Sequence, residues 1–103
     1  MRGMNDLVRQ AQMMQRKMSK LQEEMDERTV EATSGGGMVT VTATCSGKIT
    51  ALKIDPAAVD PQDVEMLQDL ILAAINEAVK KGKDTAQSEM KGLTGGINIP
   101  GLI

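Results

Sequence analysis

The apolar residues near the start of the chain are spaced for a helix. Between residues 6 and 27 they recur at intervals of four, three, four, three and four, forming a heptad seam at Leu7, Ala11, Met14, Met18, Leu21 and Met25. This spacing predicts an amphipathic helix from Asp6 to Glu27, about 33 Å long at about 1.5 Å per residue. Because the seam is narrow, we expect it to pack against another helix, either the second helix of this chain or one of a partner subunit.

The middle of the chain alternates with the period of a strand. Three strands are predicted, at residues 28–34, 38–45 and 48–54. In the second strand apolar side chains alternate with threonines, so one face is apolar and the other polar. The third strand is less regular, because Ile49 is out of phase with Leu52 and Ile54; either a bulge restores the phase or both faces are buried. Glycine turns at 35–37 and 46–47 predict an antiparallel meander.

A second helix is predicted after the strands. Asp60 followed by Pro61 is a typical helix start, and apolar residues at intervals of three and four continue to about Lys91. The predicted order is helix, three strands, helix: an α+β fold of type αβββα. We expect residues 1–91 to form one domain and the uncharged, glycine-rich residues 92–103 to form a flexible tail.

The composition excludes several classes of function. The 103 residues include no Phe, Tyr or Trp, so the core must be built from smaller side chains, and we expect a homodimer to complete it. With no His and the single cysteine Cys45, the usual catalytic bases and zinc sites are missing; we expect neither an enzyme nor a bound metal or cofactor. No apolar run is long enough for a membrane span, which together with the lone cysteine predicts a cytoplasmic protein.

Charge is sorted along the first helix against its dipole. Residues 2–20 carry five bases and only one acid, and residues 21–31 carry five acids and only one base, whereas the helix dipole favours acids first. The second helix carries lysines near its end, where Asp84 and Glu89 interrupt them. Since both helices adjoin the sheet, we expect two arms that are acidic near the sheet and basic at their distal ends. The formal net charge of −2 conceals this polarity.

The basic residues are the candidate binding site. Arg2, Arg9 and Arg16 recur every seven residues opposite the heptad seam, about 10.5 Å apart along the helix. They could track a phosphate backbone, or they could simply form the solvated face of an amphipathic helix. The adverse charge order and the lysines of the second helix favour the first interpretation. The DNA-binding candidates are Arg2, Arg9, Arg16, Lys17, Lys20, Lys80, Lys81, Lys83 and Lys91.

Three segments of the chain resemble a known family. They are NDLVRQAQMMQRKMSKLQEEM, GGGMVTVTATCSGKITALKIDP and EMLQDLILAAINEAVKK, which occur in the order and at the spacing of the YbaB/EbfC family. The resemblance covers residues 4–91. It implies a small bacterial nucleoid-associated protein, a homodimer with the sheets at its centre, and helical arms that grip duplex DNA with little sequence preference. The family supplies no list of DNA-contacting residues, so the candidates above rest on the charge argument.

Two hypotheses about function follow. The first is a nucleoid-associated protein that binds duplex DNA, mainly through contacts from Arg and Lys to phosphates. Gln10, Gln12 and Gln15 are the residues that could add contacts to base edges. The second is a helical protein-interaction or scaffold module that acts with recombination or replication proteins, because heptad seams and an apolar tail also suit a protein partner.

Overall fold

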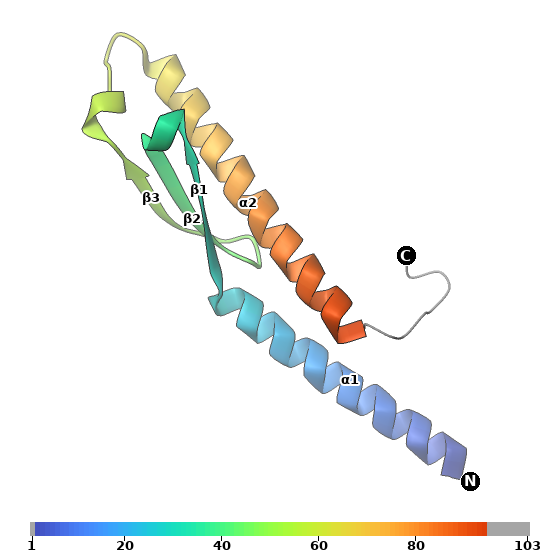
Figure 1. Cartoon of the computed structure of the whole chain (residues 1–103). Coiled ribbons are helices and arrows are strands. Elements are labelled where there is room, and N and C mark those ends of the chain that lie inside the picture. Colours follow the sequence, from blue (N-terminus) through green and yellow to red (C-terminus); the bar gives the residue numbers. More distant parts are fainter. Residues whose placement is uncertain (1, 95–103) are drawn as a thin grey trace.

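The computed structural model describes residues 2–94 and has the predicted αβββα order (Figure 1). Its elements are α1 (Arg2–Glu27), β1 (Thr29–Ser34), β2 (Val39–Thr44), β3 (Ile49–Ile54) and α2 (Val64–Thr94). Short 3-10 turns, Gly35–Gly37 and Pro56–Ala58, follow β1 and β3. All three glycines of the first turn have positive φ, a conformation that other residues adopt only at a cost. The order of the helices and strands confirms the prediction of an α+β fold.

The three strands form an antiparallel sheet in the order β1-β2-β3. Opposite β2, the pairing skips one residue of β3: Thr42 pairs with Ala51 while Ala43 pairs with Ile49. This bulge restores the phase of β3, because partners across a sheet share a face and Ile49 then lies on the same side as Leu52. Of the two alternatives for the third strand, the bulge is correct.

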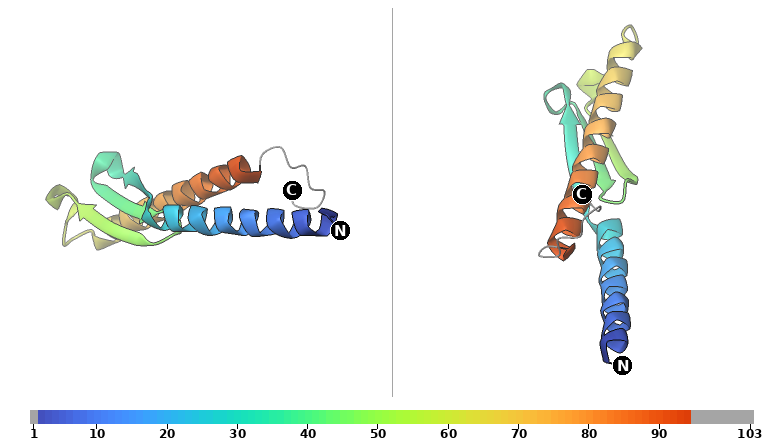
Figure 2. Two further views of the ribbon diagram at one scale, coloured as in Figure 1. Left: turned by 90° about the horizontal axis from the view of Figure 1, so that it is seen from below. Right: turned by 90° about the vertical axis from the view of Figure 1, so that its right-hand side faces the viewer.

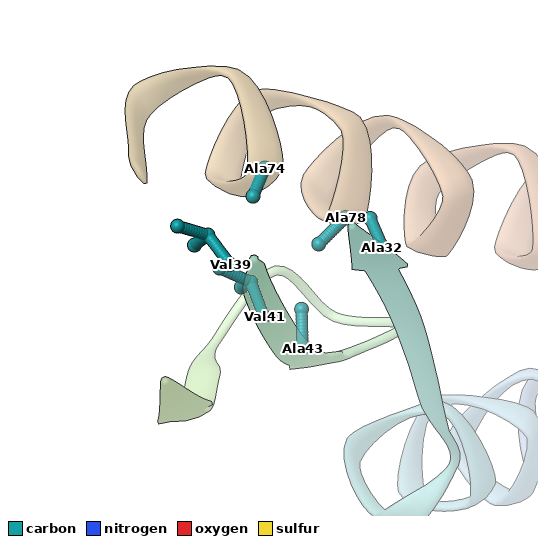
Figure 3. Close-up of a cluster of buried hydrophobic side chains, with 6 residues drawn as sticks. All are labelled: Ala32, Val39, Val41, Ala43, Ala74 and Ala78. Atoms are coloured by element: carbon teal, nitrogen blue, oxygen red, sulfur yellow. The ribbon is translucent and has the colours of Figure 1, made fainter. Parts of the chain in front are cut away.

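Helix α2 packs across β1 and β2 and leaves β3 largely uncovered. The buried cluster between them consists of small residues: Ala32, Val39, Val41, Ala43, Ala74 and Ala78 (Figure 3). Small side chains let the helix approach the sheet closely. Further along the helix Gly82 lies close to the end of β2, where a Cβ would be 2.9 Å from the carbonyl oxygen of Thr44.

Helix α1 packs against α2 near the carboxyl end of α1. There Leu21 and Met25 are buried with Cys45, and Ala86 and Leu93 of α2 pack against them. The two helices run in opposite directions at this contact (Figure 2). The prediction that the heptad seam packs against the second helix is thus correct for these two seam residues.

Several predicted helix boundaries were wrong by a few residues. Helix α1 begins at Arg2 instead of Asp6. Helix α2 begins at Val64, where the Asp63 carboxylate accepts a hydrogen bond from the Met66 amide at 3.2 Å; Asp60 instead closes the preceding turn. Helix α2 also continues to Thr94, so residues 92–94 of the expected tail are helical, and residues 95–103 lie outside the described part of the chain.

Candidate nucleic-acid interface

Most of α1 extends away from the rest of the molecule. Both views in Figure 2 show α1 continuing well past the end of α2, and the described structure is 74 Å long but only 24 × 16 Å across. We refer to residues 2–20 as the α1 arm. Good helix formers and the absence of proline keep this segment helical without a second layer behind it.

The bases of the α1 arm are available to a ligand. Arg9, Arg16, Lys17 and Lys20 are all exposed. Within residues 2–94, none of these four takes part in an ion pair or a side-chain hydrogen bond. Arg2 occupies the first residue of the helix. An anion that approaches the arm therefore meets cations that need not break an existing contact.

One side of the α1 arm is hollowed between polar side chains. The hollow is lined by Gln12, Gln15, Arg16, Ser19, Lys20 and Glu23. It brings two bases next to two amide side chains, a combination that offers hydrogen bonds both to phosphate and to the edge of a base. Glu23 lines the hollow on the side nearest the acidic end of the helix. Its negative charge disfavours an anion there, so an anionic ligand is favoured beside Arg16 on the opposite side of the hollow.

The lysines of α2 are placed differently from the prediction. Gly82 still contacts β2, so Lys80 and Lys81 lie over the sheet and not on a projecting end. Lys81 donates a hydrogen bond of 3.0 Å to the main-chain oxygen of Glu31 on β1. Lys83 is exposed just beyond this close approach, and Lys91 is exposed in the last turn of the helix. The expectation that all four lysines form the distal end of a second arm is wrong for Lys80 and Lys81.

The end of α2 instead lies against the base of the α1 arm. A groove between the two helices is lined by Lys17, Lys20, Leu21, Glu24, Glu89, Gly92 and Leu93. The Arg28 guanidinium forms an ion pair with the Glu89 carboxylate at 3.0 Å, which ties the end of α1 to α2. Sequence reasoning missed this pair and treated Glu89 only as an interruption of the lysines, because no local pattern relates residues 61 positions apart.

In residues 2–94 no group of three His, Cys, Asp or Glu side chains is arranged to hold a metal ion. None of the helices described has the length and apolar character needed to cross a bilayer. The α1 arm is therefore the candidate site that the fold presents most openly.

A comparison with known protein families decides the identity of the fold. The model of the YbaB/EbfC DNA-binding family matches residues 1–97. The chain belongs to this family. The resemblance inferred from the three segments is thereby confirmed.

Proteins similar to this chain are found in several bacteria. A nucleoid-associated protein of Clostridium acetobutylicum is 54% identical over 97% of this chain and 89% of its own length. One of Acetivibrio thermocellus is 56% identical, again over 97% and 89% of the two chains. The crystal structure of an uncharacterized Helicobacter pylori protein superposes with a TM-score of 0.76 at 26% identity, covering 86% of this chain and 94% of that one. This YbaB/EbfC member thus shares its fold with the Helicobacter pylori protein and about half of its sequence with proteins named for the nucleoid.

Proposed function

We propose that this protein binds duplex DNA in the bacterial nucleoid and that the bases of the α1 arm hold the phosphates. The observation that carries the proposal is the row of exposed, unpaired cations on a helix that projects from the fold. Within the described residues Arg9, Arg16, Lys17 and Lys20 have no acidic partner, so their positive charges repel one another unless an anion is present. A DNA backbone supplies that anion.

The spacing of the bases suits a phosphate backbone. Arg9 and Arg16 are two helical turns apart, about 10.5 Å. Phosphates on one strand of B-DNA advance about 3.4 Å along the axis, so this distance corresponds to about three nucleotides. Contacts of this kind give affinity without sequence preference, which leaves Gln12 and Gln15 in the neighbouring hollow as the side chains that could contact bases.

We also propose that the protein acts as a homodimer, joined through the uncovered side of β3. On this side Leu52 is 46% exposed and Ile49 is 38% exposed, although both face the layer occupied by α2. On α2, Leu72 is 58% exposed and shares a stripe with the half-buried Ile75 and Val79. A second copy of the chain would cover these residues and would supply the apolar area that a core without aromatic residues lacks.

The dimer proposal has a matched pair of variants. Leu52→Glu places a charge on the uncovered apolar side of β3, whereas Ala51→Glu places it on the opposite, polar side of the same strand. In sedimentation experiments the first variant is expected to have the mass of a monomer and the second that of a dimer. A dimeric Leu52→Glu variant, or a monomeric wild type, would show that this surface does not join two subunits.

DNA binding by the α1 arm is tested by charge reversal. The double variant Arg9→Glu, Arg16→Glu is expected to lose retention of labelled duplex while keeping its oligomeric mass. The control Lys48→Glu, Lys53→Glu changes the net charge equally, but at exposed sites beside and within β3. If both double variants bind duplex as tightly as the wild type, the arm is not the DNA-binding site; if both lose binding equally, only net charge matters.

The alternative function is a protein-interaction module. It is favoured by the apolar residues that remain exposed on the α1 arm, including Met4, Leu7 and Val8. In that case the purified protein would not bind duplex even at low salt, and a pull-down would recover one dominant protein. Retention of duplex at low salt, lost in the arm variant, would favour the first function.

A further inference from the structure

The heptad seam of α1 is buried near the sheet and exposed along the arm. Leu21 and Met25 are buried against α2. The next seam residues toward the amino-terminal end, which we call the arm seam, are Leu7, Ala11, Met14 and Met18. Leu7 is 66% exposed, Met18 is 43% exposed and Ala11 is exposed too, whereas Met14 is partly buried. A narrow apolar seam of this kind normally packs against a second helix.

We propose that the arm seam is covered by the arm seam of a second copy of this chain, with the two helices antiparallel. The spacing of its residues is four, three and four, which reads the same in both directions. An antiparallel copy therefore fits in one register, with Leu7 opposite Met18 and Ala11 opposite Met14. The flexible methionine side chains then fill the space beside the shorter residues. A parallel copy would place Ala11 opposite Ala11 and leave a gap there.

The charges beside the arm seam allow this pairing. The four flanking positions are Val8, Gln10, Gln15 and Lys17. Only Lys17 is charged, and in the antiparallel register it lies level with Val8 of the second copy, so no two bases face each other across the seam. Arg9 and Arg16 lie on the opposite side of the helix and remain exposed in the pair.

The pairing continues the contact that α2 already makes. Helix α2 runs in the opposite direction to α1 and covers Leu21 and Met25 (Figure 2). An antiparallel second arm would cover the seam from Met18 onward in the same direction. In this register the two Glu27 residues, at the bases of the two arms, are about 43 Å apart along the helix axis. The two sheets then lie at opposite ends of the pair, so this contact is separate from the one proposed on β3.

The pairing should be weak and should depend on salt in an unusual direction. Only the layers of the arm seam contribute to it, so we expect a dissociation constant of about 0.1 mM. Residues 2–20 carry five bases and one acid, so two arms repel each other. Salt screens this repulsion but not the apolar contact. Association should therefore strengthen as salt rises, whereas DNA binding weakens. The inference requires no bound DNA.

Sedimentation of the full-length protein without DNA tests the pairing at concentrations from about 10 µM to about 1 mM. The average mass of the wild type should rise at least about twofold, and more in high salt. Leu7→Glu should keep the mass found at low concentration. The control Met13→Glu changes a residue of the arm that is 48% exposed but lies off the seam, and it should behave like the wild type.

A constant wild-type mass would overturn the proposal, as would equal losses in both arm variants. Leu52→Glu should still associate through its arms. A Leu52→Glu variant that no longer associates would contradict a contact separate from β3.

Cross-linking tests the direction of the two helices. In a Cys45→Ala background, ¹⁵N-labelled Ala11→Cys protein is mixed with unlabelled Met14→Cys protein and oxidised. Antiparallel pairing brings these two positions together, so disulfides should join labelled to unlabelled chains at least about tenfold more often than like chains. Links mainly between like chains would show parallel arms. A mixture with Gln12→Cys, off the seam, in place of Met14→Cys should link far more slowly, and equal rates would also overturn the proposal.

Discussion

Replacing Gly82 by Ala has two opposite effects on stability. The added methyl group raises the helix propensity of α2, but it also crowds the main chain at the end of β2. A Cβ at this residue would lie 2.9 Å from the Thr44 carbonyl oxygen and 3.2 Å from the Cys45 Cα. Both neighbours are main-chain atoms, so neither can move aside by rotating a side chain. The substitution Gly82→Ala therefore forces α2 or the end of β2 to shift.

The expected effect is the difference between two opposing contributions. Replacing Gly with Ala inside a helix stabilises it by about 1 kcal/mol, whereas overpacking a close contact costs about 1–3 kcal/mol. Gly92 offers a matched control, because it lies in the same helix and a Cβ there would meet nothing within 4 Å. Gly92→Ala should therefore be neutral or stabilising by up to about 1 kcal/mol. We expect Gly82→Ala to be less stable than Gly92→Ala by about 1–3 kcal/mol.

The measurement is the free energy of unfolding in urea, followed by circular dichroism at 222 nm because the chain has no aromatic residue to serve as a fluorescent probe. All variants are compared at one protein concentration, since a dimer's stability depends on it. If Gly82→Ala is as stable as Gly92→Ala, the close approach of α2 to the sheet is not as described. The packing argument would then be refuted.

The remaining predictions concern local contacts. Asp63→Ala removes the acceptor for the Met66 amide and should lower the free energy of unfolding by about 0.5–2 kcal/mol; no change in urea would refute its role as a cap. A double-mutant cycle on Arg28 and Glu89, which are 52% and 46% exposed, should give a coupling below about 1 kcal/mol that falls further in high salt, and a larger, salt-independent value would contradict this. Val41→Ala deletes two fully buried methyl groups and should cost about 2 kcal/mol, whereas a loss below about 0.5 kcal/mol would show that Val41 does not pack as described.

Much of this fold could be predicted because its periodic signals are local. The threonine alternation of β2 and the heptad spacing of α1 each depend on neighbouring residues, and both elements are present. The start of α2 was missed by a few residues because Asp60 and Asp63 are both good caps, and only the path of the chain after Pro56–Ala58 selects Asp63. The bulge in β3 was left open for a similar reason, since the phase is set by pairing with β2.

The candidate site could be predicted only in part. The charge order along α1 is a property of one helix, so the sequence alone was enough to select its bases as candidates. These bases are exposed because the α1 arm projects from the rest of the fold. The placement of the α2 lysines depends on how far the helix stays in contact with the sheet, which Gly82 determines through a close approach to Thr44. No spacing rule relates Lys81 to its acceptor on Glu31, 50 residues away.

The central claim, that the α1 arm binds DNA through phosphates, is tested most directly by the salt dependence of duplex affinity. The slope of log K against log salt is measured for the wild type, for Arg9→Gln, Arg16→Gln and for the control Lys48→Gln, Lys53→Gln. Each phosphate contact contributes about 0.9 to the slope, so the arm variant should lose about 1.8 for one subunit in contact and about twice that for two. The control should keep the wild-type slope. An arm variant with the wild-type slope would contradict the account.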